Sequence, residues 1–291
     1  MLYTIENERV RATLSSEGGE LMSIYGKATA CEYIWQGDPA FWARRAPVLF
    51  PICGRLLDGC YTYAGKRYEM TLHGFVRGME MTVEEKTDTS ITFRVTDNEK
   101  SREMYPFSFV FRVRYTLSGD TLEVAHSVEN TDKKELIFAI GAHPGFRVPM
   151  AEGDLPSDYT LRFDSSVTEA RQVLFENNFT SHETAPYAMA DSTIPYSNEL
   201  FDAGSLFLTE MGDHVTLASK NSGRFVRLDF KGFPVLGFWH TEGSGAPFLC
   251  IEPWESIPSY FDTPEQLETK AMMNHLAPNG YYKKSYFITV G

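Results

Sequence analysis

The chain has 291 residues, of which 43% are hydrophobic and 14% aromatic, and its formal net charge is -12. A chain of this length can bury a large core, and its acidic balance disfavours nucleic acid and anionic membranes as partners. The four cysteines form no CxxC pair, and no apolar run reaches the roughly 20 residues of a membrane span. Because the N-terminal segment also lacks a signal-like apolar run, we expect a soluble cytoplasmic protein with reduced thiols.

Strand patterns dominate the chain. Residues 107–117 alternate apolar and polar side chains with period two, as expected for a strand with one buried face. Further strand patterns lie, in chain order, at residues 91–95, 122–128, 136–140, 159–163, 205–209, 214–218, 225–230, 235–239, 248–251 and 285–290. Residues 165–200 are polar and weakly periodic, which predicts a long excursion from the sheet.

Helical patterns are scarce. Residues 263–267 read as an N-cap threonine followed by a proline at the first helical position, which predicts a short helix, and residues 39–42 could form one turn. We find no internal repeat, low-complexity segment or linker. The sequence therefore predicts an all-β protein in which residues 1–291 form one large antiparallel β-sandwich domain with few short helices.

A glutamate stands at an unusual place near the C-terminal end. Glu252 directly follows the apolar run 248–251 and precedes Pro253 and Trp254. A carboxylate in such surroundings is costly unless another group pairs with it or uses it. Glu252 is therefore a candidate for chemistry.

A histidine occupies a similar place after the apolar run 136–140, in the stretch GAHPGF. Pro144 favours an extended backbone at His143. Gly141 and Gly145 are expected to allow a tight turn and the close approach of a ligand. This frame favours a functional His143 over a histidine that is merely packed at a strand end.

The other histidines are less informative. His73, in LHGF, reads alone as a turn histidine, and His126 follows the apolar phase of its strand, which predicts a core or sheet-face position. His240 could line a site or be packed. A metal site formed by His73, His143 and Glu252 is conceivable, but no HxH or HExxH motif presents two ligands together.

A glycosidase-type pair of carboxylates, Glu252 with Glu255, is also disfavoured. Three residues apart on an extended chain, the two side chains face opposite ways. P-loop and Rossmann glycine patterns are absent from the sequence.

Five stretches together resemble the aldose 1-epimerase (galactose mutarotase) family, and most closely its LacX-like branch. They are YTIENERV from Tyr3, WQGDPAFWARRAPVLFPICGRL from Trp35, LHGFVR from Leu72, IGAHPGF from Ile140 and CIEPW from Cys250. They occur in the order of the family and extend over nearly the whole chain. The sequence has GR, LHGF and HPGF where galactose mutarotases typically have NR, LHGG and HSYFNL, which leaves galactose open as the substrate.

The resemblance implies a sugar site on the concave face of a β-sandwich. His143 corresponds to the catalytic histidine of the family and Glu252 to its catalytic glutamate. Arg55 and His73 correspond to sugar-binding residues, and the sugar-binding aspartate corresponds best to Asp202. Trp239 is assigned to substrate binding as well. Which aromatic ring stacks on the sugar stays open between Trp42, Phe75, Trp239 and Trp254.

The implied activity is mutarotation of an aldose by acid and base groups, without cofactor or metal. Glu252, desolvated by its neighbours, would be the base, and His143 the imidazolium acid, with a pKa raised by the nearby carboxylate. A sugar-binding or sensing protein without catalysis and a metal-dependent isomerase are the alternatives. Arg44, Arg45 and Arg77 could hold the phosphate of a phosphorylated sugar or lie on the surface.

Overall fold

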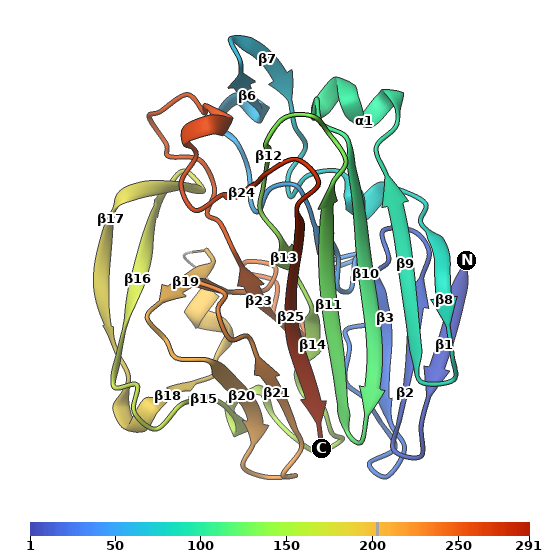
Figure 1. Ribbon diagram of the computed structural model, residues 1–291. Helices are drawn as coiled ribbons and strands as arrows, with labels where there is room; N and C mark the ends of the chain where they lie inside the picture. Colours follow the sequence, from blue (N-terminus) through green and yellow to red (C-terminus); the bar gives the residue numbers. More distant parts are fainter. Residues whose placement is uncertain (202–203) are drawn as a thin grey trace.

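The computed structural model describes residues 1–201 and 204–291 and consists mainly of antiparallel strands (Figure 1). A nine-stranded sheet and an eight-stranded sheet are the largest elements, and a four-stranded sheet lies at the N-terminal end of the chain. The prediction of a large antiparallel β-sandwich is confirmed. Among the described residues, no helix has the length and apolar character needed to cross a bilayer.

The nine-stranded sheet has the order β18-β15-β20-β21-β25-β11-β10-β9-β8. Its strands are β8 (Thr82–Lys86), β9 (Ser90–Thr96), β10 (Phe109–Ser118), β11 (Thr121–Asn130), β15 (Tyr159–Phe163), β18 (Thr193–Pro195), β20 (His214–Ser219), β21 (Phe225–Asp229) and β25 (Tyr281–Val290). Buried and more exposed side chains alternate along most of β10, as its period-two pattern predicts.

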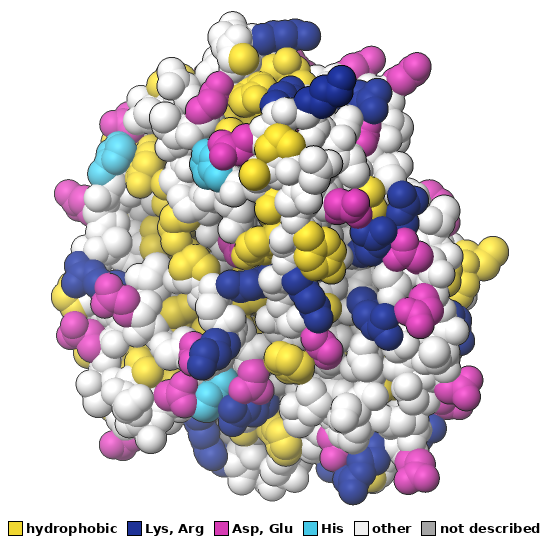
Figure 2. All heavy atoms as spheres, in the orientation of Figure 1, with side chains coloured by type: hydrophobic (Ala, Val, Ile, Leu, Met, Phe, Trp, Pro, Cys, Tyr) yellow, Lys and Arg dark blue, Asp and Glu magenta, His cyan; other side chains and the backbone are white. Residues whose placement is uncertain are grey.

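The outer face of this sheet carries charged side chains. Arg112 of β10 pairs with Glu84 of β8 at 2.7 Å and with Glu129 of β11 at 3.4 Å, and Arg114 pairs with Glu85 at 2.9 Å. Cross-strand pairs of opposite charge favour this strand pairing modestly. Basic and acidic side chains are accordingly interspersed over the face seen in Figure 2.

The eight-stranded sheet has the order β17-β16-β19-β22-β23-β13-β5, with β14 also paired to β23. Its strands are β5 (Val48–Leu49), β13 (Gly141–Ala142), β14 (Gly145–Arg147), β16 (Glu169–Glu176), β17 (Phe179–Ala188), β19 (Leu206–Thr209), β22 (Val235–Trp239) and β23 (Phe248–Trp254). Every residue of β23 is buried. The prediction that residues 165–200 leave the sheet is wrong. The strands β16 and β17 form a hairpin at the edge of the eight-stranded sheet, and β18 pairs with β15 at the edge of the nine-stranded sheet.

Three small sheets complete the fold. The four-stranded sheet contains β1 (Leu2–Glu6), β2 (Val10–Ser15), β3 (Leu21–Gly26) and β4 (Cys31–Glu32), and the two-stranded sheets pair β6 (Cys60–Tyr63) with β7 (Lys66–Glu69) and β12 (Leu136–Phe138) with β24 (Asn274–Leu276). Tyr3 of β1 packs edge-on against Phe93 of β9, with ring centroids 5.6 Å apart. This contact joins the four-stranded sheet to the nine-stranded one.

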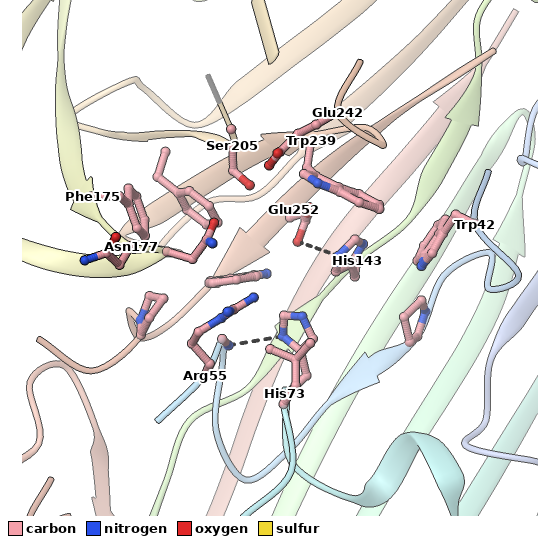
Figure 3. Close-up of a pocket in the computed structure, with 18 of the residues that line it drawn as sticks. Trp42, Arg55, His73, His143, Phe175, Asn177, Ser205, Trp239, Glu242 and Glu252 are labelled. Carbon is pink, nitrogen blue, oxygen red and sulfur yellow. Dashed lines mark hydrogen bonds and ion pairs between the residues drawn. The ribbon is translucent and has the colours of Figure 1, made fainter. Parts of the chain in front are cut away.

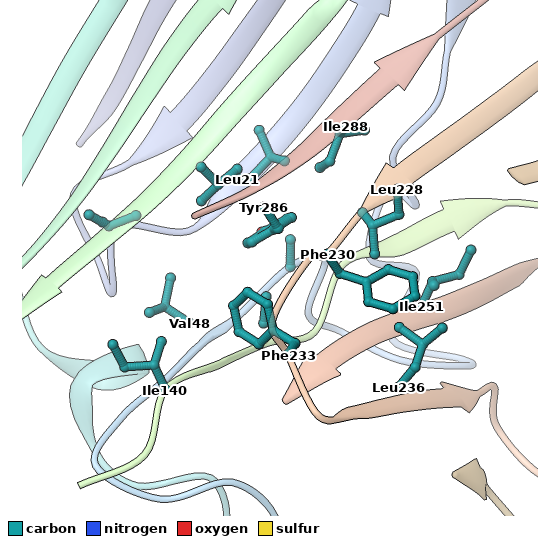
Figure 4. Packing of buried hydrophobic residues seen from close by; sticks show 14 of the residues in the cluster. Leu21, Val48, Ile140, Leu228, Phe230, Phe233, Leu236, Ile251, Tyr286 and Ile288 are labelled. Carbon is teal, nitrogen blue, oxygen red and sulfur yellow. The ribbon is translucent and has the colours of Figure 1, made fainter. Parts of the chain in front are cut away.

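The main hydrophobic core lies between the two large sheets (Figure 4). Leu228 of β21 and Ile288 of β25 come from the nine-stranded sheet, and Leu236 of β22 and Ile251 of β23 from the eight-stranded one. None of these four residues is more than 1% exposed. The core therefore fixes β23, which carries Glu252, from behind.

Helices are short. The α-helix α1 (Glu99–Met104) begins after Asn98, whose side chain accepts the backbone N–H of Ser101 in a capping box. The 3-10 helices are η1 (Leu57–Gly59), η2 (Val76–Gly78), η3 (Pro156–Asp158), η4 (Ala190–Ser192), η5 (Asn198–Phe201) and η6 (Leu267–Thr269). The helix predicted at residues 263–267 is wrong, since Gln266 forms a bridge with Thr62 and only η6 follows it. The turn predicted at residues 39–42 is present.

Candidate active site

His143 lies in a break of the sheet opposite Glu252. The pairs Gly141–Trp254 and Gly145–Cys250 flank this break in one unbroken register, and the backbone N–H of Ile251 donates to the carbonyl of Pro144 at 3.1 Å. His143 and Glu252 are therefore held face to face by strand pairing on both sides. Neither residue is exposed by more than 8%.

Gly145 provides room for an aromatic ring. A Cβ at this residue would lie 3.0 Å from a ring carbon of Trp42, which is tighter than ordinary packing allows. Neither Gly141 nor Gly145 has a positive φ angle. The sequence-based explanation by a tight turn is therefore wrong for these residues, and close packing around His143 is the reason for the glycines.

His143 and Glu252 form a close pair at the wall of a cavity (Figure 3). The Nε2 atom of His143 lies 3.2 Å from Oε2 of Glu252. Burial lowers the pKa of His143 to about 3 and raises the pKa of Glu252 well above its usual range. Burial therefore favours the neutral form of both residues, with one proton on the pair.

The predicted rise of the His143 pKa is wrong, because burial lowers it. Burial disfavours the charged form of both residues, and the positive charge of Arg77 lowers the pKa of His143 further. The shared proton therefore resides mainly on Glu252. The predicted desolvation of Glu252 is confirmed, since the side chain is only 2% exposed.

Buried polar atoms at the pair lack partners among the described residues. They are Nδ1 of His143, Nε1 of Trp254 and Oε2 of Glu252, which lies 3.2 Å from Nε2 of His143 without forming a hydrogen bond to it. A buried polar atom without a hydrogen bond costs roughly 1–3 kcal/mol. Three such atoms around one cavity are suited to a ligand that both donates and accepts hydrogen bonds.

His73 lies beside the pair. Its backbone has a positive φ of 63°, and its Nδ1 accepts the backbone N–H of Gly54 at 3.1 Å. Burial lowers the pKa of His73 well below the usual value, so the ring is neutral and its proton is on Nε2. The His73 and His143 ring centroids are 5.3 Å apart. His73 can therefore donate one hydrogen bond beside the pair.

Tryptophan rings enclose His143. The Trp42 and Trp239 centroids lie 5.0 and 5.6 Å from that of the imidazole, and Trp254 lies 5.3 Å from His73. All three tryptophans line the cavity. Phe75 does not, because it packs in the main core against Phe50 and Tyr105.

The cavity has a volume of about 510 Å³, which is in the range of small-molecule sites. Arg55 lines it, with its guanidinium carbon 5.9 Å from the Phe179 ring. The sequence analysis did not identify several further lining residues: Pro47, Phe175, Asn177, Asn178, Ser205, Phe207, Glu242 and Pro258. The two asparagines carried a signal, because an Asn-Asn step between two strands is typical of a hairpin turn.

The remaining predicted positions lie as follows. Asp202 falls outside the residues that the structure describes. Of the three arginines considered for a phosphate, Arg77 lines the cavity, whereas Arg44 pairs with Glu20 at 3.1 Å and Arg45 donates to a backbone carbonyl.

Glu255 faces away from Glu252, as predicted. It accepts hydrogen bonds from the backbone N–H of Ile140 at 3.0 Å and from Asn274 at 2.7 Å. Its own backbone N–H donates to the carbonyl of Ile140. Glu255 therefore ties the end of β23 to the chain that leads into His143.

Two other histidines are packed. His126 is fully buried in the core, as predicted, and His240 is buried with its ring nitrogens near backbone carbonyls of Thr241 and Asn198. Neither lines the cavity.

The residues considered as metal ligands from the sequence, His73, His143 and Glu252, do not form a cluster of possible ligand atoms in the structure. Donor atoms of His143, Glu252 and Cys250 lie within 4.8 Å of one another, so Cys250 takes the place that the sequence analysis gave to His73. All three residues are buried. Burial raises the pKa of the Cys250 thiol well above its usual range, which opposes metal binding by a thiolate.

The β-sandwich that carries this cavity has the fold of galactose mutarotase-like proteins. The aldose 1-epimerase family model matches residues 1–283, and the chain belongs to this family. Protein LacX, encoded on a plasmid of Lactococcus lactis subsp. lactis, is 32% identical over 303 aligned residues that cover 100% of this chain and 99% of LacX. The chain thus also resembles the LacX-like branch over its full length.

Solved structures agree with this placement. The galactose mutarotase related enzyme from Lactobacillus acidophilus superposes with a TM-score of 0.95 at 37% identity, covering 100% of this chain and 97% of that one. A galactose mutarotase-like protein from Lactobacillus casei superposes with a TM-score of 0.93 at 31% identity and covers both chains fully.

Proposed function

We propose that the protein is an aldose 1-epimerase, which interconverts the α and β anomers of a sugar by opening and reclosing its ring. The observation that carries this proposal is the buried pair of His143 Nε2 and Glu252 Oε2, 3.2 Å apart at the wall of the cavity. Binding alone does not need an acid and a base side by side, whereas ring opening of a hemiacetal needs both.

Two proton transfers accompany each ring opening, one from the anomeric hydroxyl to the base and one from the acid to O5. The base removes the proton of the anomeric hydroxyl, the C1–O5 bond breaks with its electrons on O5, and the acid protonates O5. The open aldehyde rotates about its C1–C2 bond, and the same steps in reverse close the ring on the other face. The pair ends with the proton count with which it began.

The roles of the two residues depend on where their shared proton lies. Burial favours its position on Glu252. Hydroxyl groups of a bound sugar that donate to Glu252 favour its carboxylate form. The proton then moves to His143, and Glu252 acts as base toward the anomeric hydroxyl while His143 acts as acid toward O5.

The surrounding side chains bind and orient the sugar. His73 donates from Nε2 to a sugar oxygen, and Arg55 favours the negative charge that builds on O5. Trp42 and Trp239 offer ring faces to the C–H side of the sugar. Residues that orient the sugar lower the barrier because they hold the anomeric carbon between acid and base.

Polarimetry of freshly dissolved α-anomers of several aldoses tests the proposal. The protein should increase the rate of optical rotation change above that of buffer alone, in proportion to its concentration. A protein that binds these sugars, seen as quenching of tryptophan fluorescence, without any acceleration would be a sugar-binding or sensing protein instead.

A further inference from the structure

The tip of the β16–β17 hairpin forms part of the cavity that holds His143 and Glu252. Asn177 and Asn178, at this tip, line the same cavity as the pair. In Figure 3, Asn177 and Phe175 stand on the side of the cavity opposite Trp42. The hairpin thus brings two carboxamides to a site whose reacting groups come from distant parts of the chain.

The turn itself does not require two asparagines. Glu176 pairs with Phe179, so the loop has two residues, and both have positive φ angles, 52° at Asn177 and 65° at Asn178. Such a turn is most often built as Asn-Gly or Gly-Gly, because glycine adopts positive φ without steric cost. Glycine would serve the backbone at both positions, so the geometry of the turn permits the two carboxamides without requiring them.

The hairpin tip is held in place. The backbone N–H of Thr180 donates to the carbonyl of Ser259 at 3.0 Å, and the N–H of Phe261 donates to the carbonyl of Thr180 at 3.1 Å. The register of β16 and β17 shifts between Val173 and Phe175, as at a bulge that bends a strand. These contacts fix the turn against the segment that follows β23.

Aromatic contacts fix the turn from its other sides. The Phe175 and Phe207 centroids are 5.2 Å apart, and the Phe179 ring lies 5.9 Å from the guanidinium carbon of Arg55. Ser259 in turn donates its backbone N–H to the carbonyl of Arg55 at 2.9 Å. The backbone of the turn is therefore held at a fixed place relative to Arg55.

We infer that the Asn177–Asn178 turn determines which sugar the site accepts, because its carboxamides hydrogen-bond to neighbouring hydroxyl groups of the aldose beyond its anomeric centre. This inference rests on the proposed function for the orientation of the sugar. A carboxamide both donates and accepts, as a pair of adjacent hydroxyl groups does. The turn therefore selects a neutral aldose with a particular arrangement of hydroxyl groups.

The test compares wild type with Asn177→Gly, Asn178→Gly and the double variant on glucose, galactose, mannose and xylose. Glycine keeps the turn and removes the carboxamides. For the preferred sugar, the KM of the double variant should rise at least about tenfold with little change in kcat. The ratio of kcat/KM between best and worst sugars should fall at least about tenfold, since sites built to bind a hydroxyl group discriminate strongly.

Asn279→Gly is the matched control. Asn279 also has a positive φ, 59°, but it does not line the cavity. This variant should keep the sugar preference of wild type. Should the double glycine variant unfold, Asn177→Asp and Asn178→Asp keep the shape of each side chain without its N–H donors, and we expect the same change in sugar preference.

Equilibrium binding of the same four sugars, followed by tryptophan fluorescence, separates this inference from the proposed function. Binding without turnover in wild type would overturn only the proposed function, and the change in preference should then appear in the Kd values. A folded double variant with the sugar preference of wild type would overturn the inference, as would a wild-type protein that binds none of the four sugars.

Discussion

Two buried histidines, His126 and His143, differ in what surrounds their rings. His126 of β11 is fully buried between Phe111 and Tyr286. The centroid of its ring lies 6.0 Å from the ring centroid of each of these two residues. Burial lowers the pKa of both histidines to about 3. A strongly shifted pKa therefore does not mark the active site by itself.

The difference lies in what surrounds each ring. Both ring nitrogens of His126 lack partners among the described residues, and its neighbours are aromatic. His143 has a carboxyl group at 3.2 Å and a cavity in front of it. Of these two histidines, only His143 has a second titratable group and a cavity beside it, so under the proposed function the desolvation of His143 contributes to catalysis, whereas that of His126 only lowers stability.

The largest effect is expected when either member of the pair is changed. Glu252→Gln and His143→Asn should each lower kcat by about two orders of magnitude or more while sugar still binds, because each removes one proton-transferring group. His126→Phe is the matched control and should turn over like wild type. Polarimetric initial rates of the purified, folded variants measure this, and near-wild-type turnover in either pair variant would refute the assignment.

The buried His126 should lower the stability of the protein at acidic pH. Its pKa in the folded protein, about 3, lies below the ordinary value of 6.5. Below pH 6.5 the unfolded chain therefore binds a proton that the folded chain does not, and stability falls as the pH is lowered toward 3. His126→Phe should lose about 2 kcal/mol less of its free energy of unfolding than wild type between pH 7 and pH 5.

Urea unfolding at the two pH values measures this difference. Equal losses in wild type and in His126→Phe would mean that His126 takes up its proton in the folded state. The activity at neutral pH provides an internal check that the substitution leaves the cavity intact.

A smaller effect is expected on stability at the pair. Glu252 is buried with an unpartnered oxygen and a raised pKa, so the folded protein holds it in a costly form at neutral pH. Glu252→Gln keeps the shape and should raise the free energy of unfolding by about 1 kcal/mol, as expected where activity is maintained at the cost of stability. A loss of stability in this variant would show that Glu252 is held by contacts stronger than those seen.

The smallest effect is expected from removal of metal ions. If the pair works by proton transfer alone, prolonged treatment with EDTA should leave the mutarotation rate unchanged. A rate that falls with EDTA and returns with one metal ion would instead favour an isomerase that uses the His143, Cys250 and Glu252 donors.

The sequence predicted the architecture well because the period-two patterns are local. The strands around residues 107–117 and 122–128 became β10 and β11 with the expected buried faces. The hairpin of β16 and β17 was missed because its strands lie at a sheet edge, where many side chains are exposed and the alternation is weak. Edge strands of this kind lack the hydrophobic pattern on which such predictions depend.

The sequence identified residues of the candidate site, but it did not predict how they are arranged. Glu252 and His143 could be identified because each ends an apolar strand with a polar side chain. Their contact depends on the pairing of β13 and β14 with β23, which joins residues more than 100 positions apart. The lowered pKa of His143 could not be predicted because it depends on the burial that the whole fold produces.

The central claim is that His143 and Glu252 act as one unit that carries a single proton. The pH dependence of kcat/KM, corrected for mutarotation by the buffer, tests it most directly. The account predicts a broad plateau through neutral pH, because His143 resists a second proton until about pH 3 and the raised pKa of Glu252 delays loss of the last one. A rate that rises through a single midpoint near pH 6.5, as for a solvated histidine acting alone, or one that does not change with pH, would contradict it.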